Sequence, residues 1–152
     1  MGPTVFAVRW RVAYDLKSDE DVDGMAAATR SGHGIGRDPA VVGTPEWWSL
    51  LGTERLPVHS QEGVIERVFW TGHGDFPEFT LVSPDGSRGT WPRFGDHTLY
   101  VEGLHARIQW VEQRWAEAER RAFGDVIGEV THLPVCVEVE DSDRRSAAAG
   151  RT

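Results

Sequence analysis

The sequence predicts an α+β fold: a curved, mainly antiparallel sheet packed against one long amphipathic helix, with one or two short helices beside it. Three features favour this class. The N-terminal segment alternates apolar and polar residues, the middle of the chain holds several short β-prone segments, and an apolar stripe at helical spacing runs from Gly103 to Phe123. Strands followed by a helix and a last strand are the element order of an α+β domain.

A first strand is expected over residues 4–14. Its alternating apolar side chains are Phe6, Val8, Trp10, Val12 and Tyr14. In a strand these residues share one face, while Arg9 and Arg11 lie on the other. We therefore expect Trp10 in the core and an arginine-bearing face that points to solvent or to a partner.

Two short helices are expected next. Residues 18–30 carry apolar side chains at helical spacing, although Gly24 weakens this helix by about 1 kcal/mol relative to alanine. Residues 44–51 show a better helix start, with Thr44 as the cap, Pro45 at the first helical position and an acidic residue after it. The glycine-rich stretch between them is expected to be a loop.

Residues 55–102 are expected to form an antiparallel meander. The expected strands are Val64–Trp70, Phe79–Val82, Arg88–Trp91 and Thr98–Val101. Between the second and third of these, Ser83–Ser87 contains Pro and Gly where a tight hairpin turn requires them. The meander supplies most of the predicted sheet.

The long helix is predicted over Gly103–Phe123. Its apolar stripe consists of Leu104, Ile108, Val111, Trp115, Ala118 and Ala122. Such a stripe is typical of a helix that buries one side on a sheet, and Gly124 is placed to end it. Trp110 lies off the stripe and is therefore a candidate for a partner surface.

The last part of the chain predicts one more strand and a tail. Val135, Val137 and Val139 alternate with polar residues, as in a half-buried strand. Beyond them, small and charged residues dominate, so residues 141–152 are expected to form a disordered tail. The domain prediction is one domain over residues 1–140.

Composition restricts the class of protein. The chain has 152 residues, a net charge of −8 and one cysteine, Cys136, so no disulfide within the chain is expected. The acidic balance makes nucleic acid an unlikely partner, because neutralising phosphates requires a positive face. No signal peptide and no membrane-spanning run is evident in the sequence, which predicts a soluble, cytoplasmic protein.

Tryptophan and arginine dominate the functional prediction. Seven tryptophans are many for one small core, so some of them are expected on a contact surface. The preference for arginine over lysine indicates a bacterial genome of high GC content. The sequence favours a non-catalytic binding or accessory protein that acts through a Trp/Arg-bearing surface towards a protein partner or a second copy of itself. The candidate contact residues are Trp48, Trp70, Trp91, Trp110, Arg9, Arg11 and His33.

A metal-dependent enzyme is the first alternative. His73 and Asp75 are two residues apart, so in an extended segment both side chains point to the same side. With His132 or His97 they would form a set of two histidines and one carboxylate, as in non-haem iron enzymes. The chain is short for such enzymes, and a His-x-Asp pair arises easily by chance.

A small-molecule-binding domain is the second alternative, with Trp70 and Trp91 as walls of an aromatic pocket. Gly-His-Gly occurs around both His33 and His73, which suits either a contact histidine or an ordinary turn. The chain has no phosphate-binding glycine loop, no nucleophile elbow and no zinc-protease motif. Binding is therefore favoured over catalysis, and no particular cofactor is indicated.

Overall fold

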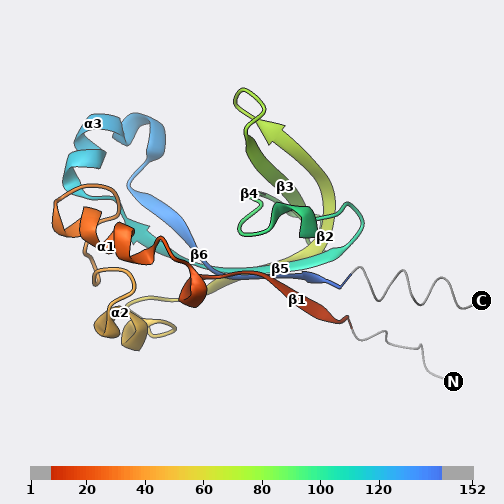
Figure 1. Cartoon of the computed structure of the whole chain (residues 1–152), viewed down its shortest axis with the longest axis horizontal. Helices are drawn as coiled ribbons and strands as arrows, with labels where there is room; N and C mark the ends of the chain where they lie inside the picture. The colour runs from red at the N-terminus through yellow and green to blue at the C-terminus, as the bar shows by residue number, and fades with distance from the viewer. Residues whose placement is uncertain (1–7, 142–152) are drawn as a thin grey trace, which may run out of the picture. The chain divides into compact units, whose positions relative to one another are not determined.

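The computed structural model describes residues 8–141 (Figure 1). In chain order the helices and strands are β1 Trp10–Asp15, α1 Val22–Arg30, α2 Pro45–Leu50, β2 His59–Thr71, β3 Phe76–Val82, β4 Arg88–Pro92, β5 His105–Arg114, α3 Glu117–Ile127 and β6 Val130–Glu140. The strands form one open antiparallel sheet in the order β1-β6-β5-β2-β3-β4. The predicted α+β class with a mainly antiparallel sheet is confirmed.

The chain packs as two compact units. Of the described residues, the strand-rich unit holds 8–14, 61–108 and 136–141, and the helix-rich unit holds 15–60 and 109–135. Strands β1, β2, β5 and β6 each contribute residues to both units. The single domain over 1–140 stays a prediction. The predicted tail lies outside the described residues except for Asp141, whose backbone N–H donates to the Arg9 carbonyl.

The meander of the strand-rich unit forms as predicted for its first three strands. Val68 of β2 pairs with Phe79 of β3, and Phe79 in turn pairs with Trp91 of β4. Phe79, Leu81 and Ile65 are fully buried and form the centre of this unit's core. The turn between β3 and β4 closes with a bond from the Ser83 N–H to the Ser87 carbonyl, as the Pro-Asp-Gly sequence predicts.

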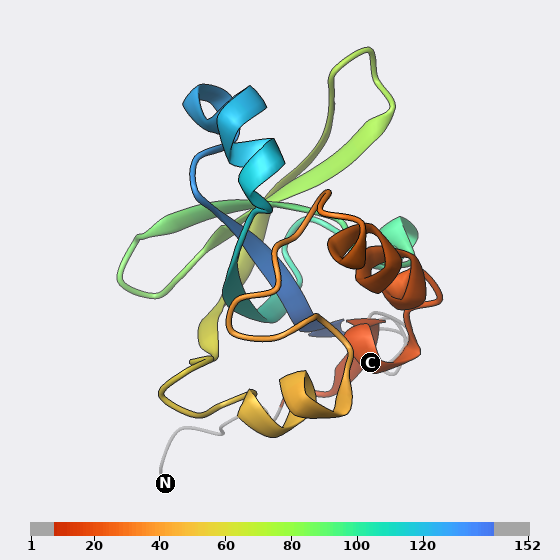
Figure 2. The ribbon, with the colours of Figure 1, turned by 90° about the vertical axis from the view of Figure 1, so that its left-hand side faces the viewer.

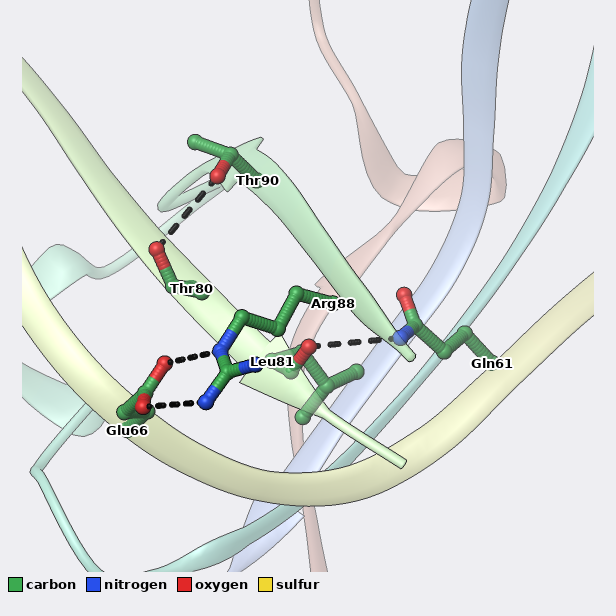
Figure 3. Close-up of polar contacts among 6 residues, drawn as sticks. All are labelled: Gln61, Glu66, Thr80, Leu81, Arg88 and Thr90. Carbon is green, nitrogen blue, oxygen red and sulfur yellow. Dashed lines mark hydrogen bonds and ion pairs between the residues drawn. The ribbon is translucent and has the colours of Figure 1, made fainter. Parts of the chain in front are cut away.

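A β-bulge in β2 adds a charged contact to this meander. The register with β3 shifts between Ile65 and Arg67, so Glu66 is the additional residue. Glu66 accepts two hydrogen bonds from Arg88 of β4, at 3.0 and 3.1 Å (Figure 3). The hydrogen bond from Arg88 lowers the pKa of the Glu66 carboxyl, and that of Arg88 is raised in return. This exposed bidentate ion pair connects β4 to the bulged strand β2.

Polar side chains also connect the strands beside the bulge. The hydroxyls of Thr80 and Thr90 lie 3.3 Å apart, and the Gln61 amide donates to the Leu81 carbonyl at 3.3 Å (Figure 3). The indole N–H of Trp91 donates to the Gln61 side-chain oxygen at 3.2 Å. Trp91, predicted as a contact residue, is therefore half-buried and has a hydrogen-bond partner within the sheet.

The strand expected at Thr98–Val101 is wrong, since residues 97–99 form a short 3₁₀ turn. Asp96 accepts bonds from both the backbone N–H and the hydroxyl of Thr98, at 3.0 and 2.6 Å. Local side-chain bonds of this kind compete with strand pairing. Mainly because of the Thr98 side-chain bond, the pKa of Asp96 lies below its ordinary value, and the charge of Arg11 contributes.

The predicted long helix Gly103–Phe123 is also wrong. Its first half is strand β5, and helix α3 begins only at Glu117. In β5 the buried residues are Ala106 and Ile108, then Val111 and Gln113, so the alternation shifts by one residue midway. That shift turned a strand pattern into an apparent helical stripe.

The N-terminal strand faces the core differently from the prediction. Val12 is exposed and Ala13 is buried, whereas Phe6 lies outside the described residues. A side chain at Gly95 would collide with the Ala13 carbonyl, so the backbone of β1 approaches the 94–96 loop closely there. Trp10 is only half-buried, and the Arg107 guanidinium lies 4.2 Å from its ring centroid.

The helix-rich unit is organised around a buried amide. Both expected short helices are present, and Thr44 caps α2 by accepting from the Trp47 N–H. The Trp47 indole donates to Gln113 of β5 at 3.3 Å. The Gln113 amide donates to the carbonyls of Gly36 and Ala40, at 3.1 and 2.8 Å. Figure 2 shows the connection that carries these carbonyls passing the start of α3 before it reaches α2.

Replacing this amide tests its structural role. Gln113 is 1% exposed, and Gln113→Leu would leave the Trp47 indole and two carbonyls without their partner. Unpaired buried polar groups cost about 1–3 kcal/mol each, so we expect urea unfolding to show a loss of about 3 kcal/mol. The exposed Gln109 of the same strand gives the control, Gln109→Leu, with an expected change below about 0.5 kcal/mol. Equal effects of the two changes would contradict the assignment.

Tyr100 occupies the core of the strand-rich unit. Its ring packs 4.9 Å from that of Phe79, and its hydroxyl donates to the Phe94 carbonyl at 2.7 Å. Burial raises the pKa of this hydroxyl far above its ordinary value, because the phenolate would lose its hydration. The folded protein therefore holds Tyr100 in its neutral form.

This burial predicts a loss of stability in alkali. The unfolded chain releases the phenol proton near pH 10, whereas the folded chain retains it, so stability is complete below about pH 10 and falls above it. Above this pH, the ionisation of Tyr100 in the unfolded chain lowers the free energy of unfolding by up to about 1.4 kcal/mol per pH unit. Tyr100→Phe should reduce the loss of unfolding free energy per pH unit, measured by chemical unfolding at pH 9–12 and compared with the wild type. An unchanged slope in Tyr100→Phe would count against this origin.

Candidate partner-binding surfaces

The end of the β2–β3 hairpin presents large aromatic side chains. Trp70 is 50% exposed and Phe76 is 62% exposed. Trp70 pairs with Pro77, and Thr71 pairs with Phe76, so the two aromatic residues point to opposite faces of the hairpin. Figure 1 shows β2 and β3 as a long hairpin that ends in the turn between them.

An arginine contacts an aromatic ring on each face. The Arg67 guanidinium lies 4.6 Å from the Phe69 ring centroid, and the Arg93 guanidinium lies 5.0 Å from that of Trp70. His97 packs edge-on against Trp70 at 5.4 Å. We name these six residues the hairpin surface: Arg67, Phe69, Trp70, Phe76, Arg93 and His97.

Arg93 supports this surface from beneath. It is only 8% exposed, and its Nη2 donates to the Phe69 carbonyl at 3.2 Å. Its Nε has no hydrogen-bond partner among residues 8–141. A buried cation held under an exposed tryptophan restricts the positions of the indole.

The turn of the hairpin contains the proposed metal-binding pair. Gly72 and Gly74 have φ values of 65° and 87°, and His73 and Asp75 are exposed beside them. His132 lies in β6 of the other unit, 3.7 Å from Glu112. Within the described part of the chain, no three His, Cys, Asp or Glu side chains are grouped so that they could hold a metal ion. The metal site stays a prediction from the sequence.

The helix-rich unit carries a second aromatic cluster, around Trp110. The His59 ring stacks on Trp110 with centroids 5.7 Å apart, and His132 lies at 6.3 Å. Trp110 is half-buried, and both histidines are exposed. Contact of Trp110 with a partner stays a prediction.

The remaining predicted contact residues are scattered. Trp48 packs edge-on against the buried Trp47 at 4.8 Å and is half-buried. Arg9 and Arg11 are exposed in and beside β1, and His33 is exposed in the turn after α1. Arg9 and Arg11 belong to the strand-rich unit, whereas Trp48 and His33 belong to the helix-rich unit.

Sequence reasoning missed a pocket of about 570 Å³ in the helix-rich unit. Its lining comes from the end of α1, the loop after it, the end of β5 and the first turns of α3. Four arginines line it: Arg37, Arg114, Arg120 and Arg121. Arg37 lies far in sequence from the other three, so composition showed the abundance of arginine without indicating that these four gather.

The structure thus shows an open antiparallel sheet that carries exposed aromatic and arginine side chains, which suit contact with a partner. A model of the family "Immunity protein RhsI2" matches residues 13–126, about three quarters of the chain. The protein belongs to this family. The match begins within β1 and ends within α3, and it includes both the hairpin surface and the pocket. A comparison with curated proteins found no match. Membership of an immunity-protein family agrees with the predicted binding role towards a protein partner.

Arg93 can be tested as a positioning residue. Arg93→Met keeps much of the side-chain volume but removes the bond to the Phe69 carbonyl and the cation beside Trp70. We expect a stability loss of about 1–3 kcal/mol in urea unfolding and a more mobile Trp70 indole in NMR relaxation. Arg67→Met, at an exposed position, should cost less than about 1 kcal/mol and leave the Trp70 indole unchanged. An equally ordered Trp70 in Arg93→Met would contradict this role.

Proposed function

We propose that this protein is a non-catalytic immunity protein that binds an Rhs toxin and holds it inactive, with the hairpin surface as the main contact. The family match supports the toxin as the partner. The observation that carries the choice of surface is the exposure of Trp70 and Phe76 at the end of one hairpin. Both are large apolar side chains that gain most when a partner covers them.

The chemistry of the hairpin surface suits a protein interface. Tryptophan and arginine are the residue types most enriched among residues that dominate binding energy. Trp70 is held by Arg93 and His97, and the strands beneath it are paired through their backbones. Less conformational entropy is lost on binding when side chains are ordered beforehand. This surface therefore favours a tight complex over a transient one.

Charge supports the same kind of partner. The chain carries a net charge of −8. Its acidic field attracts a protein with a basic surface and accelerates the encounter, especially at low salt. Among the described residues no helix is long and apolar enough to cross a membrane. We further propose that binding takes place in the cytoplasm, where the toxin would be held before it reaches its target.

The central test removes the two aromatic anchors. Trp70→Ala and Phe76→Ala should each weaken toxin binding about tenfold or more, because a partner that encloses the end of the hairpin covers both of its faces. Isothermal titration calorimetry with the purified toxin domain measures this change. Both side chains are exposed, so the folded state should keep nearly its normal stability.

Phe123→Ala is the matched control. Phe123 is an exposed aromatic residue of α3 in the helix-rich unit and lies outside the hairpin surface. It should change binding less than threefold. If the Trp70 and Phe76 variants bind as tightly as the wild type, the hairpin surface is not the contact. Self-association of the wild type that depends on Trp70 in light scattering would point to a second copy as the partner.

A further inference from the structure

The arginine pocket of the helix-rich unit lies where three segments converge. The Gly36 N–H donates to the Arg114 carbonyl at 2.7 Å, and the Ala116 N–H donates to the Gly34 carbonyl at 2.8 Å. A side chain at Gly36 would press on the carbonyls of Arg114 and Trp115, so only glycine allows this approach. These contacts bring the loop after α1 against the junction of β5 and α3 and form the pocket wall.

The lining carries more positive than negative charge. Four arginines face two carboxylates, those of Asp38 and Glu117. Arg121 pairs with Glu117 at 2.6 Å, and the Arg120 Nε donates to the Trp115 carbonyl at 3.1 Å. The side chains of Arg37 and Arg114 form no hydrogen bond or ion pair with any other described residue. Two exposed guanidinium groups thus remain available to an anion.

Residues of the same lining also carry N–H groups that lack an acceptor among the described residues. Helix α3 begins after Ala116, which provides no side-chain cap, so the first N–H groups of the helix lack a capping acceptor. The indole N–H of Trp115 is buried and has no acceptor within residues 8–141. Arginine forks and helix N-termini both prefer oxyanions. The whole lining therefore favours a negatively charged group.

We infer that this pocket binds a carboxylate of an acidic segment of the toxin, an inference that rests on the proposed function. Guanidinium groups recognise carboxylates through two parallel hydrogen bonds, which gives direction as well as affinity. Asp38 and Glu117 already neutralise part of the arginine charge. The remaining charge matches one or two carboxylates better than a phosphate chain.

The net positive charge of the pocket lining gives the pocket a role in specificity. The chain as a whole is acidic, so it attracts the basic side of a partner. At the arginine pocket the same basic side would be repelled. A toxin is attracted to both the pocket and the acidic remainder of the protein surface only if it places an acidic group opposite the pocket. Its basic surface then faces the acidic remainder. The pocket thus selects the orientation of the bound toxin and rejects toxins without that group.

Charge reversal tests the inference with the toxin itself. Arg37→Glu combined with Arg114→Glu should weaken toxin binding more than tenfold in calorimetry. The control combines Arg30→Glu with Arg55→Glu, two exposed arginines of the same unit outside the pocket lining, and carries the same change of net charge. It should change the Kd less than threefold. Circular dichroism and urea unfolding verify that all variants remain folded.

A second measurement needs no toxin. Titration of the ¹⁵N-labelled wild type with a hexaglutamate peptide should shift the Trp115 indole signal, assigned with Trp115→Phe. Hexalysine should leave the signal in place, and Arg37→Glu with Arg114→Glu should abolish the shift. A response to inorganic phosphate stronger than that to hexaglutamate would overturn the carboxylate assignment, as would the absence of any shift.

The outcomes separate the inference from the proposed function. If the wild type binds the toxin and the pocket variant binds equally well, the pocket inference is overturned and the immunity function stands. If the wild type does not bind the toxin at all, the proposed function fails and the inference fails with it. A selective loss in the pocket variant, together with the hexaglutamate shift, supports both.

Discussion

The helix-rich unit depends on one buried amide. Gln113 receives the indole N–H of Trp47 and donates to two carbonyls of the 36–40 loop. Helix α2 and the 36–40 loop are thus joined to β5 through a single side chain. Because the partners include two backbone carbonyls, a hydrophobic residue of equal volume cannot replace it. The loop held by Gln113 also supplies Gly36 and Arg37 to the pocket, so the core contact and the candidate anion site share one support.

Much of the fold was predictable because local patterns and tertiary structure agree there. Thr44-Pro45 starts α2, and the Pro-Asp-Gly turn joins β3 to β4, since each depends on backbone preferences of a few residues. The stripe from Leu104 onwards misled because a shift of alternation within β5 imitates helical spacing. Asp96 converted an expected strand into a turn by bonding to Thr98. The first failure is an irregular strand pattern that resembles a helix, and the second is a local side-chain bond that overrides strand propensity.

The candidate sites were predictable to different degrees. A surplus of tryptophan predicted a Trp/Arg surface, and the proposed contact is Trp70 with Arg93 packed beneath it, although the sequence could not show which tryptophans remain exposed. Trp47 and Trp70 each have one aromatic neighbour in sequence, yet Trp47 is fully buried and Trp70 is half-exposed. The arginine pocket was not predictable, because its residues come from segments whose proximity only the packing determines.

The position of the aromatic residues at the end of a hairpin has a consequence for how such a protein changes over generations. Residues 72–76 are exposed, and a lengthened or altered turn costs little free energy in a surface loop. The core residues Ile65, Phe79 and Leu81 lie further along the same strands. Substitutions at the turn can therefore alter the recognised partner while the buried packing stays intact. A lineage facing a new toxin could change its specificity within a few residues and inherit the remaining fold unchanged.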